Sequence, residues 1–556
     1  DLRTEETRRW ENVQAFAFAD ARRALVVKKR QGDSDDEHDG TDLIVRYLDS
    51  GEEELFSYVD EWGLDEEGGR LAYTLDTPEG ESNGVLLLDL DTRARRVLDA
   101  EREAAYADLT WGDEKHHPSA DALAVLKGTE DEKLVETENA LLLWPALSES
   151  YEEVVLDPRP VKKDSAAADS ASAGRGAGAA SRSSATSADA RTPDAFPENW
   201  VLSEKGSLRW APDATRVFVA TRPQHPDPET LCKAAASDST DSAGPTIFRM
   251  ASRYGPDGRP LGPEEVLNGT CPEFMADVDI WHVQDDRLQS VQMIRASRDR
   301  NQTYTGVVHI DGEGSSRSAL AAADGHGQPN AEGRQARFVQ LADTTMELVQ
   351  ISDNGRAAMG RNDKPYVSDW EPSYADYYLV DLDTGERTPV LEKHLRTLGF
   401  SPDGAHYLYW KDRHVWSYDV AGGEHTNLTA DIPVTFENEE FDRMGEKPPH
   451  GIAGWTADST GVILEHRYDL WLQPLDGGEA TDLTNGVGAE NEIQFRIVDL
   501  DPEEELTDLS EPLVLSAYGQ WTKDAGFYRL NDGRMRELVM EAATFGRVTK
   551  ADSTNR

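Results

Sequence analysis

FSPDGAHYLYWKDRHVWSYDVAGGEHTNLT (400–429) and WTADSTGVILEHRYDLWLQPLDGGEATDLT (455–484) are two copies of one pattern. Each begins with an aromatic residue and a short turn containing Asp, and then has two runs of β-branched and aromatic residues before Gly-Gly-Glu. Asp-Gly and Gly-Gly dipeptides supply the positive φ angles that tight hairpins need, and the runs between them favour strands. Each copy therefore predicts an antiparallel strand-turn-strand unit. The two starts are 55 residues apart because a charged stretch, FENEEFDRMGEKPPH (436–450), is inserted between the copies.

Six weaker copies of the same unit occur elsewhere in the chain. They begin at FAFADARRALVVKKR (16–30), WGLDEEGGRLAYTLDT (62–77), LTWGDEKHHPSADALAVLKG (109–128), WAPDATRVFVATRP (210–223), ISDNGRAAMGRND (351–363) and LVLSAYGQWTKDAGFYRLNDGRMREL (513–538). In the copy at 210–223 we expect the second strand within DVDIWHVQDDRLQSVQ (277–292).

A short antiparallel sheet has two faces to bury, and repeated sheets bury them against one another by arranging themselves radially as blades. The eight copies therefore predict an all-β fold, a β-propeller of eight four-stranded antiparallel blades. Seven blades is the alternative, because one copy can lie outside the ring or complete another blade. A pair of sheets in a β-sandwich would need fewer and more regular strands.

The predicted boundaries follow from these copies. Residues 1–15 are a lead-in, with a short helix expected over Thr4–Val13, and residues 16–545 form the propeller. The Ala-, Ser- and Gly-rich segment 164–192 has almost nothing to bury and is expected to be a disordered insertion, and 312–334 a mobile loop. The stretch 436–450 is an inserted loop, and 546–556 is expected to lead toward a further C-terminal domain.

The chain is strongly acidic, with 106 Asp and Glu, 42 Arg, only 15 Lys and a net charge of −49. The self-repulsion of such a surface is screened in molar salt, where the Debye length is about 3 Å. This balance predicts a halophilic source, with an ordinary acidic protein as the alternative. Nucleic-acid binding is not expected, since phosphates would meet a repelling field. No run approaches the roughly 18 apolar residues that a membrane helix needs.

The sequence has none of the common catalytic signatures. Gly-x-Ser-x-Gly, His-Glu-x-x-His, a P-loop and a dinucleotide fingerprint are all missing from the sequence. We therefore predict no catalytic residue, metal site or cofactor in this chain, and whether the parent polypeptide is an enzyme stays open at this point. The adjacent His116 and His117 are predicted in a solvated turn, and His282 as a packing residue on a strand.

Two weaker site predictions remain. In the inserted loop, Glu439 and Glu440 could meet a cationic group such as a peptide amine, since loops of this length on rigid scaffolds often bind ligands. The alternative is a solvated acidic loop. Cys232 and Cys271, the two cysteines of the chain, form either one loop-closing disulfide in an oxidising compartment or two free thiols.

With these repeats the chain resembles the N-terminal β-propeller region of bacterial serine peptidases of the prolyl oligopeptidase family. The resemblance is strengthened by DVDIWHVQDDRLQSVQMIRASRDRNQTY (277–304) and EKPPHGIAGWTADS (446–459), and runs from about Glu11 to about Leu538. It implies that the propeller gates the access of peptide substrates to a separate α/β-hydrolase domain and docks that domain. We expect the catalytic triad to lie outside this chain. The resemblance also implies a periplasmic or secreted location, with a cytoplasmic one left open, and would suit a Cys232–Cys271 disulfide.

Two alternatives from other classes stay open. One is a stand-alone TolB-like propeller that binds another protein, because SPDG-type repeats also occur there. The other is a propeller glycosidase or lyase, which would need carboxylates clustered at one mouth of the channel. The sequence does not distinguish an endopeptidase from a dipeptidyl or an acylaminoacyl peptidase.

Overall fold

A computed structural model describes most of the strand-forming sequence. The described residues are 7–19, 22–31, 38–112, 118–131, 133–159, 196–227, 282, 285–311, 327–328, 335–500, 506–548 and 550. The disordered insertion predicted at 164–192, the two cysteines and the adjacent histidines 116 and 117 lie outside them. No helix of the described part is both long enough and apolar enough to cross a membrane.

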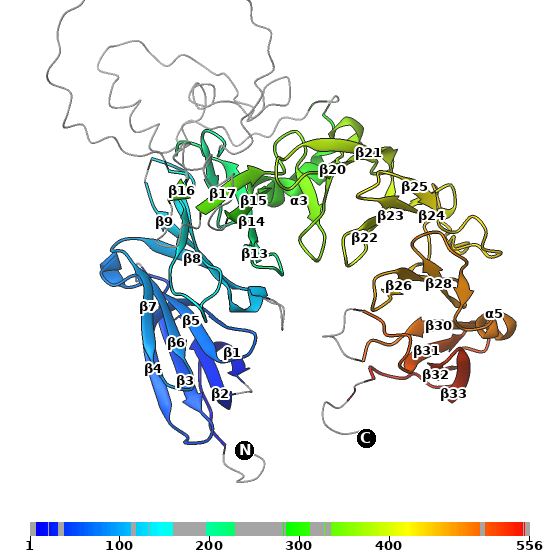
Figure 1. The fold of residues 1–556 in the computed structure, drawn as a ribbon, viewed down its shortest axis with the longest axis horizontal. Coiled ribbons are helices and arrows are strands. Elements are labelled where there is room, and N and C mark those ends of the chain that lie inside the picture. Colours follow the sequence, from blue (N-terminus) through cyan, green and yellow to red (C-terminus); the bar gives the residue numbers. More distant parts are fainter. Residues whose placement is uncertain are drawn as a thin grey trace, which may run out of the picture. The chain divides into compact units, whose positions relative to one another are not determined.

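The chain divides into two compact units. Unit 1 comprises Asp1–Asp285, Gln289–Thr344 and Asp383–Gly385, and unit 2 comprises Asp286–Leu288, Thr345–Leu382 and Glu386–Arg556. In the described parts of both units almost all regular structure is antiparallel β-sheet (Figure 1). The predicted all-β class is therefore confirmed.

Unit 1 begins with a sheet of seven strands in chain order. The strands are β1 (Val13–Ala19), β2 (Ala24–Lys29), β3 (Thr41–Tyr47), β4 (Glu53–Leu64), β5 (Arg70–Leu75), β6 (Gly84–Asp89) and β7 (Arg95–Ala100). The 12-residue strand β4 pairs with β3 through its first half and with β5 through its second half, and Val59 takes part in both ladders. The sheet therefore contains two four-stranded meanders that share one strand.

Two further sheets complete unit 1. The first has the order β16-β11-β10-β9-β8, and the second the order β12-β14-β15-β17 with β13 also paired to β14. Their bounds are β8 (Ala105–Trp111), β9 (Leu123–Thr129), β10 (Glu138–Trp144), β11 (Val154–Leu156), β12 (Trp200–Leu202), β13 (Arg209–Trp210), β14 (Arg216–Pro223), β15 (Tyr304–Asp311), β16 (Gly327–Gln328) and β17 (Gln335–Gln340), with helix α3 (Gln289–Arg300) before β15.

Unit 2 is a series of four sheets, each a four-stranded meander in chain order (Figure 1). The first sheet comprises β18 (Leu348–Ile351), β19 (Ala358–Asn362), β20 (Ala375–Val380) and β21 (Arg387–His394). The second comprises β22 (Arg396–Phe400), β23 (His406–Lys411), β24 (His414–Asp419) and β25 (His425–Asn427). The last two comprise β26 (Gly451–Trp455), β27 (Gly461–Glu465), β28 (Leu470–Pro474), β29 (Thr481–Asp482), and β30 (Ile493–Ile497), β31 (Leu513–Gly519), β32 (Ala525–Asn531), β33 (Arg534–Glu541), with the short helix α5 (Val487–Asn491) before β30.

In the two clearest copies the turn that opens the repeat is built by a side-chain hydroxyl. In the copy at 400–429 the Ser401 hydroxyl donates to Asp403 Oδ1 at 2.6 Å and accepts from the backbone N–H of His406 at 2.9 Å. Thr456 makes the same two kinds of bond in the next copy, to Asp458 at 2.6 Å and from Gly461 at 2.9 Å. These bonds satisfy backbone groups that the first hairpin would otherwise leave unpaired, so the sequence repeat is a repeat of turn chemistry.

The core of unit 2 lies between consecutive sheets. Tyr377 of β20 and Tyr407 of β23 belong to one buried cluster. Trp410 of β23 and Leu464 of β27 belong to the next cluster, in which Trp410 is only 1% exposed. Replacing a buried aromatic of this kind by alanine costs about 3–5 kcal/mol. The sheets thus bury their faces against their neighbours, as the repeat pattern predicts.

Three expectations about the elements were wrong. The described part of the expected helix Thr4–Val13 is not helical, because Asn12 has a left-handed φ of 55° and Val13 begins β1, paired with Lys29. The second strand of the copy at 210–223 is β15, because the end of the stretch 277–292 begins helix α3 instead. The loop expected at 312–334 contains β16, which pairs with β11; the rest of that loop lies outside the described residues.

Candidate functional site

The inserted loop (436–450) closes on itself before the chain enters β26. The backbone N–H of His450 donates to the Phe436 carbonyl at 2.9 Å, and that of Asn438 donates to the Pro448 carbonyl at 2.8 Å. The Phe436 side chain is buried in the core beside β23 and β27. The loop is thus anchored at both ends by the sheets that it connects.

The two predicted binding residues of this loop have different surroundings. Glu440 accepts a bond of 2.6 Å from Arg467, in the β27–β28 connection, and a second one from the Gln520 side chain, in the β31–β32 turn. Glu439 is exposed, and its carbonyl accepts from Lys447 Nζ at 2.8 Å. The Glu440 carboxylate therefore fastens the loop to two neighbouring sheets. Binding of a cationic ligand by Glu439 and Glu440 stays a prediction.

A half-buried set of ionisable groups lies near the start of β26. Arg496 and Glu465 form an ion pair of 3.1 Å. Burial raises the pKa of Glu465 against the opposing effect of Arg496, and burial lowers the pKa of Arg496. Burial, with the charges of Arg496 and of His466 adding to it, lowers the pKa of His450 to about 4. His450 is therefore uncharged at neutral pH.

A second candidate site, which we name the aromatic pocket, lies on the sheets β18–β21 and β22–β25. Its volume is about 700 Å³, and Glu392, Lys393 and His394 at the end of β21 lie opposite residues of the β23–β24 hairpin. The ring of Tyr409 contacts those of His394, at 5.2 Å and 87°, and of Trp416, at 6.2 Å and 22°. The Tyr409 hydroxyl lies 2.9 Å from His425 Nδ1. Tyr409 is thus buried beneath the lining, with its ring between those of His394 and Trp416.

The aromatic pocket was not predicted from the sequence. Its residues come from two repeats, and each repeat read alone accounts for its aromatic side chains as core. The one available signal was the scarcity of lysine, since Lys393 and Lys411 are two of only 15 lysines in the chain.

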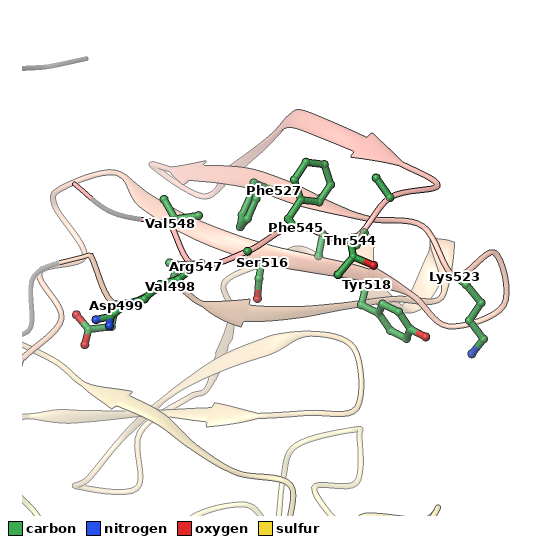
Figure 2. A pocket seen from close by; sticks show the side chains of 15 residues that line it. Val498, Asp499, Ser516, Tyr518, Lys523, Phe527, Thr544, Phe545, Arg547 and Val548 are labelled. Carbon is green, nitrogen blue, oxygen red and sulfur yellow. The ribbon is translucent and has the colours of Figure 1, made fainter. Parts of the chain in front are cut away.

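A smaller hollow of about 380 Å³ lies between β31, β32 and the chain that follows β33 (Figure 2). It is mainly apolar, with Phe527 and Phe545 in edge-to-face contact at 5.4 Å. Ser516 is the lining serine, and its hydroxyl donates to the Arg496 carbonyl at 3.3 Å. No histidine is among its lining residues, whose ionisable members are Asp499, Tyr518, Lys523 and Arg547.

His282 is exposed, and its backbone N–H donates to Asp285 Oδ2 at 3.0 Å. This placement contradicts the prediction of a packing residue on a strand. In the described ranges, no group of three or more His, Cys, Asp or Glu residues is arranged to hold a metal ion. The proposed disulfide between residues 232 and 271 lies outside these ranges.

No family model and no curated protein matches this sequence. Among solved structures, the chain is similar to the β-propeller domain of the Trilobed protease from Pyrococcus furiosus, with 10% identity, a TM-score of 0.25 and coverage of 93% of this chain and 91% of that one. It is also similar to dipeptidyl peptidase 4 of Porphyromonas gingivalis, with 7% identity, a TM-score of 0.34 and coverage of 92% and 58%. A third is the acylaminoacyl peptidase of Pyrococcus horikoshii, with 12% identity, a TM-score of 0.24 and coverage of 93% and 50%.

These three neighbours are two peptidases and the propeller domain of a protease, and the chain is also similar, over 36% of its length, to a putative TolB from Agrobacterium tumefaciens. The peptidases among them are of the group that the sequence motifs resemble. The chain spans 58% of the second neighbour's length and 50% of the third's. Identities and TM-scores this low establish no activity for it.

Proposed function

We propose that this chain is the non-catalytic propeller domain of a serine peptidase of the prolyl oligopeptidase family. In this proposal eight four-stranded blades form the propeller, which docks an α/β-hydrolase domain and limits the size of the peptides that reach it. The chain would work outside the cytoplasm, in the periplasm or secreted, where residues 232 and 271 could form a disulfide.

The observation that carries the proposal is the match between repeats and meanders. The eight sequence copies correspond to the two meanders that share β4 and to one meander in each of the six other described sheets. Units of this kind in the described part of the chain, together with a sequence that holds no common catalytic signature, support a scaffold role.

The test compares this chain with the product of the complete reading frame that contains it. Both are treated with a fluorophosphonate probe, which labels activated serines, and both are assayed on chromogenic peptides of increasing length. We expect no label and no hydrolysis with this chain, and labelling with hydrolysis of short peptides by the longer product. Longer product blocked beforehand with unlabelled fluorophosphonate is the control for serine-dependent cleavage.

Three results would overturn the proposal. If this chain alone takes the label, it contains its own nucleophile. If neither protein takes the label or cleaves peptides, the peptidase assignment fails, and a protein-binding propeller becomes the leading account. Cleavage of glycosides or polyuronides by either protein would support a glycosidase or a lyase instead.

A further inference from the structure

The aromatic pocket is lined by unpaired charges of both signs. Lys393, Lys411, Glu392, Asp412 and Glu446 all line it, and in the described part of the chain none of them forms an ion pair. The remaining charged lining residue, Arg413, is paired with Glu437 at 2.9 Å. Side chains of opposite sign that share a pocket without neutralising one another leave both charges available to a ligand.

The two lysines are held by the aromatic side chains instead. Lys411 Nζ lies 5.7 Å from the centre of the Trp416 ring, and Lys393 Nζ lies 5.2 Å from that of Tyr374. A cation over an aromatic face is attracted by the ring, and its hydrogen-bond donors remain free for an anion.

Lys393 is positioned by a strained backbone. Its φ is 44°, in the left-handed region that a non-glycine residue adopts only at a cost in free energy. Asp376 holds this conformation by accepting from the Lys393 backbone N–H at 2.8 Å and from the Tyr366 hydroxyl at 2.7 Å. The strain occurs where the ladder between β20 and β21 is irregular, and it places Lys393 in the pocket lining.

The histidines of the pocket add no charge at neutral pH. Burial, together with the nearby Lys411, lowers the pKa of both His394 and His425. Burial raises the pKa of Glu446, opposed by Arg396 and assisted by Asp412 and Glu437. The lining therefore combines neutral rings, two ammonium groups and three carboxyl groups.

We propose that the aromatic pocket binds a free aromatic amino acid or a short peptide as a zwitterion. Lys393 and Lys411 hold its carboxylate, Asp412 and Glu446 hold its amine, and its side chain packs against Trp416. The volume of about 700 Å³ suits this size, since small-ligand pockets range over roughly 300–1,000 Å³. The proposal does not depend on the proposed peptidase role, because it concerns binding by this chain alone.

The test measures binding of three probes to this chain by isothermal titration calorimetry. The probes are phenylalanyl-glycine, its N-acetyl derivative and its C-terminal amide, so that each derivative lacks one charge. We expect the zwitterion to bind and each capped form to bind at least about tenfold more weakly, because each loses a charge-assisted contact.

Variants assign each charge to its residue. In Lys411→Met the preference for the acid over the amide should shrink, and in the double variant Lys393→Met with Lys411→Met the two should bind alike. In the double variant Asp412→Asn with Glu446→Gln the free amine and the N-acetyl form should bind alike. Lys411→Arg should keep the preference for the acid. Lys523→Met is the matched control, because Lys523 Nζ lies 5.4 Å from the Tyr518 ring outside this pocket, and binding should not change.

Three outcomes would overturn the proposal. The first is equal binding of the capped and uncapped probes. The second is a loss of affinity in Lys411→Met that is the same for all three probes while the melting temperature is unchanged, since the lysine would then not read the carboxylate. The third is no binding of phenylalanyl-glycine at millimolar concentration.

Discussion

The Ser401 side chain is fully buried, and its hydroxyl forms hydrogen bonds with groups of the turn. Removing it in Ser401→Ala leaves the His406 N–H and the Asp403 carboxylate without that partner. We expect a loss of about 1–2 kcal/mol in the free energy of unfolding, measured by urea denaturation. Ser50→Ala, in an exposed turn, is the control and should change the stability by less than about 0.5 kcal/mol. If the two variants lose the same free energy of unfolding, the buried hydroxyl stabilises the fold no more than an exposed one, and the prediction fails.

His450 gives the protein a pH dependence with a definite sign. Its pKa in the folded chain is lowered to about 4, whereas an unfolded histidine titrates near 6.5, so the unfolded state binds more protons between these values. Its contribution to stability is therefore present at pH 7 and is lost as the pH falls from about 6.5 toward 4. After allowance for partial solvent exposure, we expect a loss of about 1 kcal/mol between pH 7 and pH 5.

The measurement for His450 is the difference between the wild type and His450→Gln, taken at both pH values. Other groups titrate in the same range with the opposite sign, since burial raises the pKa of Asp60 and of Asp108 to about 6. A comparison at each pH cancels them. If the two proteins lose the same stability on acidification, His450 titrates normally and the prediction fails.

At the scale of elements, Asp469 joins the β27–β28 connection to helix α5. Its carboxylate accepts from the Gly488 N–H at 2.8 Å, the Ala489 N–H at 2.9 Å and the Thr484 hydroxyl at 2.8 Å, and the residue is 2% exposed. In Asp469→Asn one acceptor becomes a donor facing N–H groups. We expect the free energy of unfolding, measured by thermal denaturation, to fall by about 2–3 kcal/mol. Asp353→Asn, on an exposed turn, should leave the stability unchanged, and an equal loss there would refute the assignment.

The elements also show what could be predicted from the sequence and what could not. Hairpins such as β23–β24 follow directly from turn residues and from runs with strand propensity. Helix α3 could not be predicted from periodicity, because none of its residues is buried and it has no apolar stripe. The aromatic pocket could not be predicted either, since the pairing of β20 with β21 is irregular and the register that brings Lys393 toward Tyr409 depends on tertiary contacts.

At the scale of the whole molecule, the net charge of −49 dominates. We propose that the protein is adapted to high salt, and we expect its melting temperature to rise by more than about 5 °C between dilute buffer and 2 M KCl, because salt screens the repulsion between carboxylates. Sucrose of equal osmolarity is the control, since it stabilises proteins by exclusion without screening charge. An equal rise in both solutions, or none in KCl, would contradict the adaptation to salt.

The shared strand β4 bears on how such a chain could have grown. Repeat proteins lengthen or shorten by copying or losing whole units, and a clean copy needs a boundary in a connection. Between β21 and β22 such a boundary exists, because one residue separates strands of different sheets. Within β4 there is none, since the ladders to β3 and to β5 both use Val59. The first two repeats could therefore be inherited, duplicated or deleted only together, whereas the repeats of unit 2 could be exchanged one at a time.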